Sequence, residues 1–201
     1  NIKIIMMNWQ TVFNPFLKLS EKQLFVFGFL FFSINSFVCF FTQTRTDSIF
    51  HFTPQENLSL SSAVLFSSVS TLSAIVFLYL LAIIINKKTR LIDIINTILI
   101  SQAPNFFILL SIKYSEMDAL AKNLKTSTGV TPDAAASAIN LIPLIICILI
   151  LLIFIVYGFV LLYNGFKTAT NLKKWQHIAL FIIALFVFLT FHQFYIQYLD
   201  L

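Results

Sequence analysis

Residues 141–163 read LIPLIICILILLIFIVYGFVLLY, an apolar run without a charged side chain. An α-helix rises about 1.5 Å per residue, so a run of this length crosses the roughly 30 Å hydrocarbon core of a bilayer. Comparable runs lie at residues 24–41, 62–85, 91–112 and 178–195. The sequence therefore predicts an all-α integral membrane bundle of five transmembrane helices, with the whole chain in a single membrane domain.

The composition favours the same class. Hydrophobic residues make up 59% of the chain and charged residues 10%, which is too little polar surface to cover a water-soluble globule. The net charge of +5 comes from Lys and Arg residues beside the apolar runs, where such residues set membrane orientation. We therefore expect a lipid bilayer as the surroundings and no nucleic-acid partner.

The connections predict further detail. Residues 9–19 carry apolar side chains near helical spacing and predict a short interfacial helix, as does an amphipathic stretch within the exterior loop 113–139. Residues 42–61 are polar and are expected to form the first exterior loop. The first run should remain as a span, because it ends without a small-x-small cleavage site. Met7 is the expected start of translation, and residues 1–6 an upstream extension.

Basic residues are spread unevenly over the connections. Three Lys or Arg residues lie before the first run, three in the turn 86–90 and three in the connection 164–177. The loop 42–61 carries one and the carboxyl-terminal tail none, while the third connection spreads three over its length. The positive-inside rule therefore predicts a cytoplasmic amino terminus and an exterior carboxyl terminus.

The third run is the most polar of the five. Its candidate intramembrane face consists of Asp93, Asn96, Thr97, Ser101, Gln102 and Pro104. Spacings of three and four residues place most of these on one side of a helix. Asp93 follows Arg90 closely and is interpreted as an interfacial or structural residue, with a proton or ion site as the alternative. Pro104 predicts a packing kink, or else a discontinuous helix beside a transport site.

The second run has a candidate helix-packing face of small residues, which are Ser67, Ser70, Thr71 and Ala74. Small side chains let helix backbones approach closely. The half from Phe77 to Ile85 is expected to face lipid. The short turn 86–90 predicts that the second and third runs pack as a hairpin.

Patterns for catalysis or metal binding are missing from the sequence. Cys39 and Cys147 lie inside apolar runs without metal-ligand spacing, and His192 is a lone imidazole in the last run. Asn35 and Tyr157 are interpreted as interhelical hydrogen-bonding residues. With no H-E-x-x-H, G-x-S-x-G or Gly-rich phosphate loop, we expect no enzyme, no cofactor and no bound metal.

The order of parts resembles the bacterial branch of the Yip (Ypt/Rab-interacting protein) family of five-span membrane proteins. The resemblance rests on the opening Asn14-Pro15-Phe16, the polar loop after the first span, the hairpin joined at 86–90, the Pro-containing stretch 95–107 and two closing spans. It implies a non-enzymatic role in organising or trafficking membranes, here in a bacterial inner membrane. The long amino-terminal arm of the eukaryotic members is missing, so Rab-type GTPase binding is not implied.

We therefore predict a scaffold or accessory subunit that associates with other membrane proteins in a homo- or hetero-oligomer. The alternative is a small transporter or channel that uses the polar face of the third run. A membrane enzyme with unrecognised catalytic groups is the third hypothesis.

Overall fold

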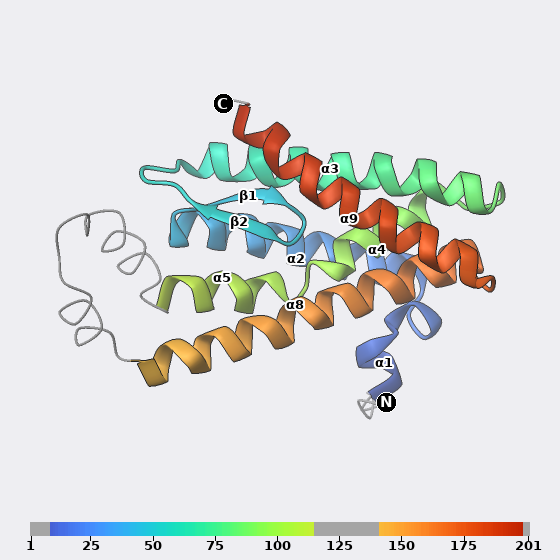
Figure 1. Cartoon of the computed structure of the whole chain (residues 1–201), viewed down its shortest axis with the longest axis horizontal. Helices are drawn as coiled ribbons and strands as arrows, with labels where there is room; N and C mark the ends of the chain where they lie inside the picture. Colours follow the sequence, from blue (N-terminus) through green and yellow to red (C-terminus); the bar gives the residue numbers. More distant parts are fainter. Residues whose placement is uncertain (1–8, 115–140, 199–201) are drawn as a thin grey trace.

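The computed structural model describes residues 9–114 and 141–198 of the chain (Figure 1). Five segments are long and apolar enough to cross a membrane: Glu21–Thr42, Leu60–Ile85, Leu91–Lys113, Ile145–Thr170 and Trp175–Ile196. The predicted all-α membrane bundle is confirmed, and the chain is a multi-pass membrane protein. The amphipathic helix expected within 113–139 lies outside the described residues.

The elements have the following bounds. The helices are α1 (Trp9–Phe13), α2 (Glu21–Thr42), α3 (Leu60–Ile85), α4 (Leu91–Ser101), α5 (Asn105–Tyr114), α8 (Leu141–Thr170) and α9 (Trp175–Tyr198). A 3-10 turn, η1 (Pro15–Leu17), follows α1, and two short strands, β1 (Thr44–Ser48) and β2 (His51–Pro54), lie between α2 and α3.

Local signals explain where α2 begins and ends. Ser20 and Gln23 form a capping box, in which the Ser20 hydroxyl accepts the Gln23 backbone N–H at 3.4 Å and the Gln23 side chain accepts the Ser20 N–H at 2.9 Å. These bonds satisfy two donors that a helix start leaves free. Gln43 closes the helix in the left-handed conformation with φ 53°, which turns the chain into β1.

The third span is interrupted at Pro104. Proline lacks the N–H that would continue the helical hydrogen bonds, so α4 ends at Ser101 and α5 begins at Asn105. This span lies at the centre of the bundle, where α4 packs against α2, α3 and α8. An 18-residue stretch of the span is 67% buried, against 17% in the fourth and fifth spans. The central position explains how a polar span is kept away from lipid.

The two closing spans cover the second and third spans with aromatic contacts. Phe77 of α3 stacks on Phe188 of α9 with ring centroids 4.6 Å apart, and Phe166 of α8 stacks on Phe181 of α9 at 4.5 Å. The expectation that the second half of α3 faces lipid is therefore only partly right. Leu78, Leu81 and Ala82 belong to the buried core and pack beneath α8 and α9, while Leu80 and Ile84 face outward.

The stretch expected as an exterior loop is instead a β-hairpin tucked between the helices (Figure 1). Strands β1 and β2 pair antiparallel, with Thr44 opposite Pro54 and Arg45 opposite Thr53. β1 packs against α2, α3 and α9. At the tip, Ile49 is 1% exposed and the Phe50 ring lies 4.8 Å from the Phe159 ring of α8. The stretch therefore forms strands where a loop was expected, because neighbouring helices pack against β1, and its exterior position stays a prediction.

The amino-terminal segment lies against α8. The Tyr157 hydroxyl donates to the Val12 carbonyl at 2.9 Å, and the Asn164 amide donates to the Phe13 carbonyl at 2.8 Å. Phe13 also meets the Tyr157 ring edge-on at 5.7 Å. Figure 1 shows α1 projecting from the side of the bundle, while η1 leads from it into α2.

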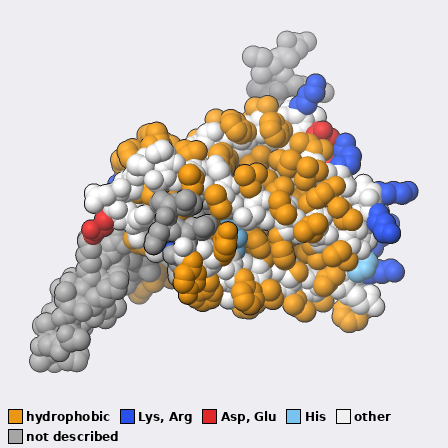
Figure 2. All heavy atoms as spheres, turned by 90° about the horizontal axis from the view of Figure 1, so that it is seen from above, with side chains coloured by type: hydrophobic (Ala, Val, Ile, Leu, Met, Phe, Trp, Pro, Cys, Tyr) orange, Lys and Arg blue, Asp and Glu red, His pale blue; other side chains and the backbone are white. Residues whose placement is uncertain are grey.

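The two ends of the bundle differ in charge. Figure 2 shows apolar side chains over the flank and Lys and Arg side chains gathered at one end. We call this the basic end; the turn 86–90 and the connection 171–174 lie there. The opposite end, where α2 ends and α3 begins, is the hairpin end.

Gly28 allows α2 to approach α4 closely. A Cβ built on Gly28 would lie 2.6 Å from Leu99 Cβ, an atom fixed directly to the α4 backbone. We predict that Gly28→Ala lowers the unfolding free energy by about 1–3 kcal/mol through overpacking, because neither helix can move without disturbing the third span. Thermal unfolding in detergent checks this. Val26→Ile, which adds a methylene on the exposed side of α2, should leave the unfolding temperature unchanged, and equal temperatures for all three proteins would contradict the prediction.

Candidate functional site

The predicted polar face of the third span divides into two groups. Asp93, Asn96 and Thr97 lie near the start of α4 at the basic end, and all three line one cleft. Ser101, Gln102 and Pro104 lie at the interruption and are buried. Apolar side chains at residues 98–100 separate the two groups, so they form two sites with different surroundings.

The cleft at the basic end has a volume of about 290 Å³ and is formed by three stretches of chain distant in sequence, of which the middle one is residues 90–97. Phe16 and Leu19 come from the amino-terminal segment, Glu21 and Leu24 from α2, and the last turns of α8 contribute Gly165 and Thr168. A Cβ on Gly165 would lie 2.7 Å from Thr97 and Phe16. Glycine therefore allows α8, α4 and η1 to meet at the cleft.

Charged side chains at the cleft pair with one another. The Arg90 guanidinium lies 2.7 Å from Asp93 and 2.9 Å from Glu21. Hydrogen bonding and charge from Asp93, followed by the charge of Glu21, raise the pKa of Arg90 above its usual value. Asp93 is thus paired with Arg90 at the basic end of the bundle, and its interfacial role stays a prediction.

Two polar residues lie deeper in the cleft. The Asn96 amide donates to the Glu21 carbonyl at 3.3 Å, while Asn96 Oδ1 is buried without a hydrogen-bond partner among the described residues. The Thr97 hydroxyl donates to the Asp93 carbonyl at 2.7 Å. The Asn96 bond connects α4 to the first turn of α2, whereas the Thr97 bond lies within α4.

At the interruption, side-chain hydrogen bonds connect the third span to α2, α3 and the hairpin. The Asn35 amide of α2 donates to the Gln102 carbonyl at 2.7 Å. The Gln102 side chain donates to the Thr71 hydroxyl of α3 at 3.1 Å, and the Asn105 amide donates to the Ile49 carbonyl of the hairpin at 3.0 Å. Ser101 bonds only to the Ile98 carbonyl of its own helix. Three elements are therefore tied together at one level of the bundle.

The predicted packing face of α3 is buried along its length. Ser67 lies 3.3 Å from the Thr46 hydroxyl of β1, and Thr71 is the residue that accepts from Gln102. Ser70 and Ala74 are 1% and 0% exposed. The small residues thus face the hairpin and the third span.

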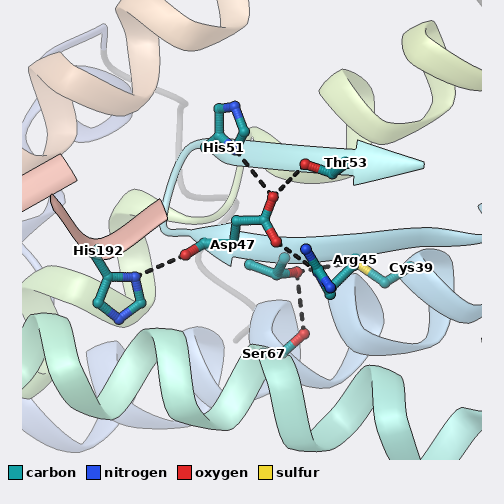
Figure 3. A network of polar contacts seen from close by, with 8 residues as sticks. Cys39, Arg45, Asp47, His51, Thr53, Ser67 and His192 are labelled. Carbon is teal, nitrogen blue, oxygen red and sulfur yellow. Dashed lines mark hydrogen bonds and ion pairs between the residues drawn. The ribbon is translucent and has the colours of Figure 1, made fainter. Parts of the chain in front are cut away.

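A network centred on Asp47 was missed by the sequence analysis (Figure 3). The buried Asp47 carboxylate lies 2.7 Å from Arg45 Nε and 3.3 Å from His51 Nδ1, and it accepts a hydrogen bond from the Thr53 hydroxyl. Burial alone would raise the pKa of the Asp47 carboxyl. The bonds from His51, Thr53 and Arg45, together with the Arg45 charge, outweigh burial and hold the pKa below its usual value.

The network extends to both sides of the hairpin. His192 of α9 lies with Nδ1 2.7 Å from the Asp47 carbonyl, and Cys39 of α2 lies with Sγ 3.3 Å from the Thr46 hydroxyl. Thr44 and Thr46 alternate in a way typical of a strand, but the two residues between the strands, Ile49 and Phe50, are not the Asn-Gly type that signals a tight hairpin. The sequence therefore carries only a weak signal for a β-hairpin in this stretch.

The arrangement favours holding elements together. Among residues 9–114 and 141–198, no group of three His, Cys, Asp or Glu side chains is placed to hold a metal ion. Asn35, Asn105 and His192 each bond to a backbone carbonyl of another element. Such bonds satisfy backbone groups that lipid leaves unsatisfied.

Two Asp–Arg pairs allow a comparison of a buried and an exposed charge. We predict that Asp47→Asn lowers the unfolding free energy by roughly 3 kcal/mol, because Arg45 loses the countercharge of a buried pair. The loosened hairpin should also expose Cys39 to maleimide, measured in a Cys147→Ser background. Asp93→Asn is the matched control at an exposed pair and should change neither readout appreciably. Equal maleimide labelling of the two Asp variants would refute the assigned role of Asp47.

Comparisons with known proteins agree with this architecture. No curated protein and no solved structure matches the chain. A family model described as the Yip1 domain matches residues 9–196, which include all five membrane helices, the hairpin and the cleft. The chain therefore belongs to the Yip1 domain family.

Proposed function

We propose that this protein is a non-enzymatic scaffold or accessory subunit that associates with other membrane proteins. The observation that supports the proposal is the use of polar side chains at the interruption of the third span. Asn35, Gln102 and Asn105 tie α2, α3 and the hairpin to this span. A span whose polar side chains are hydrogen-bonded to neighbouring elements is suited to a rigid framework.

The outer surface offers room for lateral association. An apolar groove of about 440 Å³ runs between α8 and α9, with Phe159, Tyr163, Phe181 and Leu189 among its lining residues. Phe186 lies at this groove and is 72% exposed. Grooves that present aromatic side chains are favourable sites for packing another apolar helix. The family membership is consistent with a role through protein contacts.

We also propose that the basic end faces the cytoplasm and the hairpin end faces the exterior. The described basic residues gather mainly at one end of the bundle (Figure 2), and such residues are retained on the cytoplasmic side. A bacterial inner membrane is the location we propose, with the amino terminus inside and the carboxyl terminus outside.

One observation favours a second candidate function, that of a small transporter or channel. The cleft at the basic end is lined by Asp93 and Asn96, and its lining is partly polar and partly apolar. However, the next polar residues along the span, Ser101 and Gln102, are buried and bonded. This arrangement favours a closed cleft over a continuous path.

Association can be measured in polymer nanodiscs cut from native membranes. We predict that mass photometry and mass spectrometry find the chain in complexes larger than a monomer. Phe186→Ala should weaken these complexes about tenfold, the size of an interface hot spot. Phe29→Ala, at an exposed aromatic residue on α2, is the matched control and should leave them intact. Monomers alone in every preparation would overturn the scaffold proposal.

A flux assay separates the second candidate from the first. In proteoliposomes, the scaffold proposal predicts no ion or solute flux above that of protein-free vesicles. A transporter using Asp93 would instead give a flux that Asp93→Asn abolishes, because the substitution removes the carboxylate charge. Such a flux would contradict the scaffold proposal and support the transporter.

A further inference from the structure

The cleft at the basic end presents hydrogen-bond acceptors, because its threonine hydroxyl protons and one N–H of its Asn96 amide are already committed. The Thr97 and Thr168 hydroxyls donate to the Asp93 and Asn164 carbonyls at 2.7 and 2.8 Å. The Asn96 amide donates to the Glu21 carbonyl. A hydroxyl oxygen keeps lone pairs after its proton is committed, so these residues offer oxygen atoms to a ligand.

Asn96 supplies the most specific of these oxygens. The residue lines the cleft and is 2% exposed, yet its Oδ1 has no partner among the described residues. A buried acceptor without a hydrogen bond is unfavourable. A ligand that brings an N–H donor to Asn96 would satisfy this atom.

The charge of the cleft favours a cationic donor. Glu21 and Asp93 supply two carboxylates, and Arg90 supplies one guanidinium, which leaves one negative charge. The last turns of α8, including Thr168, add the negative end of a helix dipole. The starts of α2 and α4 are the positive ends of their helices, and they lie next to Glu21 and Asp93 in their first turns.

An apolar groove shares a lining residue with the cleft. It has a volume of about 340 Å³, and Lys22, Phe25, Val26 and Ile92 line it. Glu21 lines both the cleft and the groove, so the two meet at its side chain. A phospholipid could place its ammonium group among the acceptors of the cleft. Its phosphate would then meet the Lys22 ammonium, and its acyl chain would lie against the apolar side chains of the groove.

We propose that this cleft binds a primary ammonium group, supplied by the ethanolamine headgroup of a phospholipid whose acyl chain follows the groove beside α2. Three N–H donors distinguish this headgroup from choline, which carries the same charge without a donor. Recognition through Asn96 Oδ1 requires those donors. The site therefore selects the primary amine over its methylated form.

The experiment titrates the full-length chain, purified in detergent, with phospholipids that share acyl chains and differ in headgroup methylation. Native mass spectrometry counts the bound lipid. We expect phosphatidylethanolamine to bind about tenfold more tightly than phosphatidylcholine, as one lost charge-assisted hydrogen bond requires. Equal affinities for the two lipids would overturn the proposal without any substitution in the protein.

A matched pair of variants localises the effect. Asn96 and Asn105 lie on the same span, are each 2% exposed, and each donates to a backbone carbonyl while its Oδ1 lacks a partner among the described residues. Asn96→Leu should abolish the preference for phosphatidylethanolamine, and Asn105→Leu should retain it. An equal loss of preference in both variants would overturn the assignment to the cleft, because a general loss of structure would then explain it.

Competition with a soluble amine identifies the source of the ammonium group. If the lipid is the source, free ethanolamine should fail to displace phosphatidylethanolamine, because it lacks the contacts of the phosphate and the chain. Displacement by ethanolamine at concentrations similar to the lipid would overturn the lipid assignment and make a soluble amine the ligand of the cleft.

Discussion

The interruption of the third span depends on a constraint that governs the rest of the molecule. Inside a bilayer, a backbone carbonyl freed by proline has no water to bond with and must find a donor within the protein. At Pro104 the freed carbonyl is that of Ile100, and the Ala103 N–H donates to it at 3.1 Å. Asn35 adds a side-chain donor to the next turn at the Gln102 carbonyl, and the Asn105 side chain donates to the hairpin backbone. These bonds tie the third span to its neighbours at the centre of the bundle, where α2, α3 and α8 cover it.

The polar groups of the hairpin must also find partners inside the bundle, and charged side chains supply some of them. Arg45 and Asp47 enter the bundle as a pair, with His51 and Thr53 completing the partners of the carboxylate. His192 lies against the backbone of the same strand. Polar chain is therefore tolerated among membrane helices because most of its polar groups bond to another part of the protein. The cleft at the basic end differs in its surroundings, since the open acceptor of Asn96 lies beside a cleft lined by charged side chains.

The sequence predicted those features that depend on neighbours along the chain. The apolar runs that set the spans and the break at Pro104 are each visible in a local stretch of sequence. The hairpin was not predicted, because its burial depends on α3 and on His192 of α9, far away in the sequence. The polar face was recognised as a set of residues, but its division into a cleft and a tied interruption depends on Glu21, Asn35 and Thr71, which belong to other helices.

The bond between Asp47 and His192 also has a meaning for biosynthesis. The two residues are 145 positions apart, so ribosomes that add about 5–20 residues per second need roughly 10–30 s to make the second after the first. Throughout that interval β1 carries the Arg45–Asp47 ion pair, while α9, which packs against it in the finished protein, has not yet been made. The nascent protein therefore depends on temporary shielding by water, a chaperone or the insertion machinery until its last helix arrives.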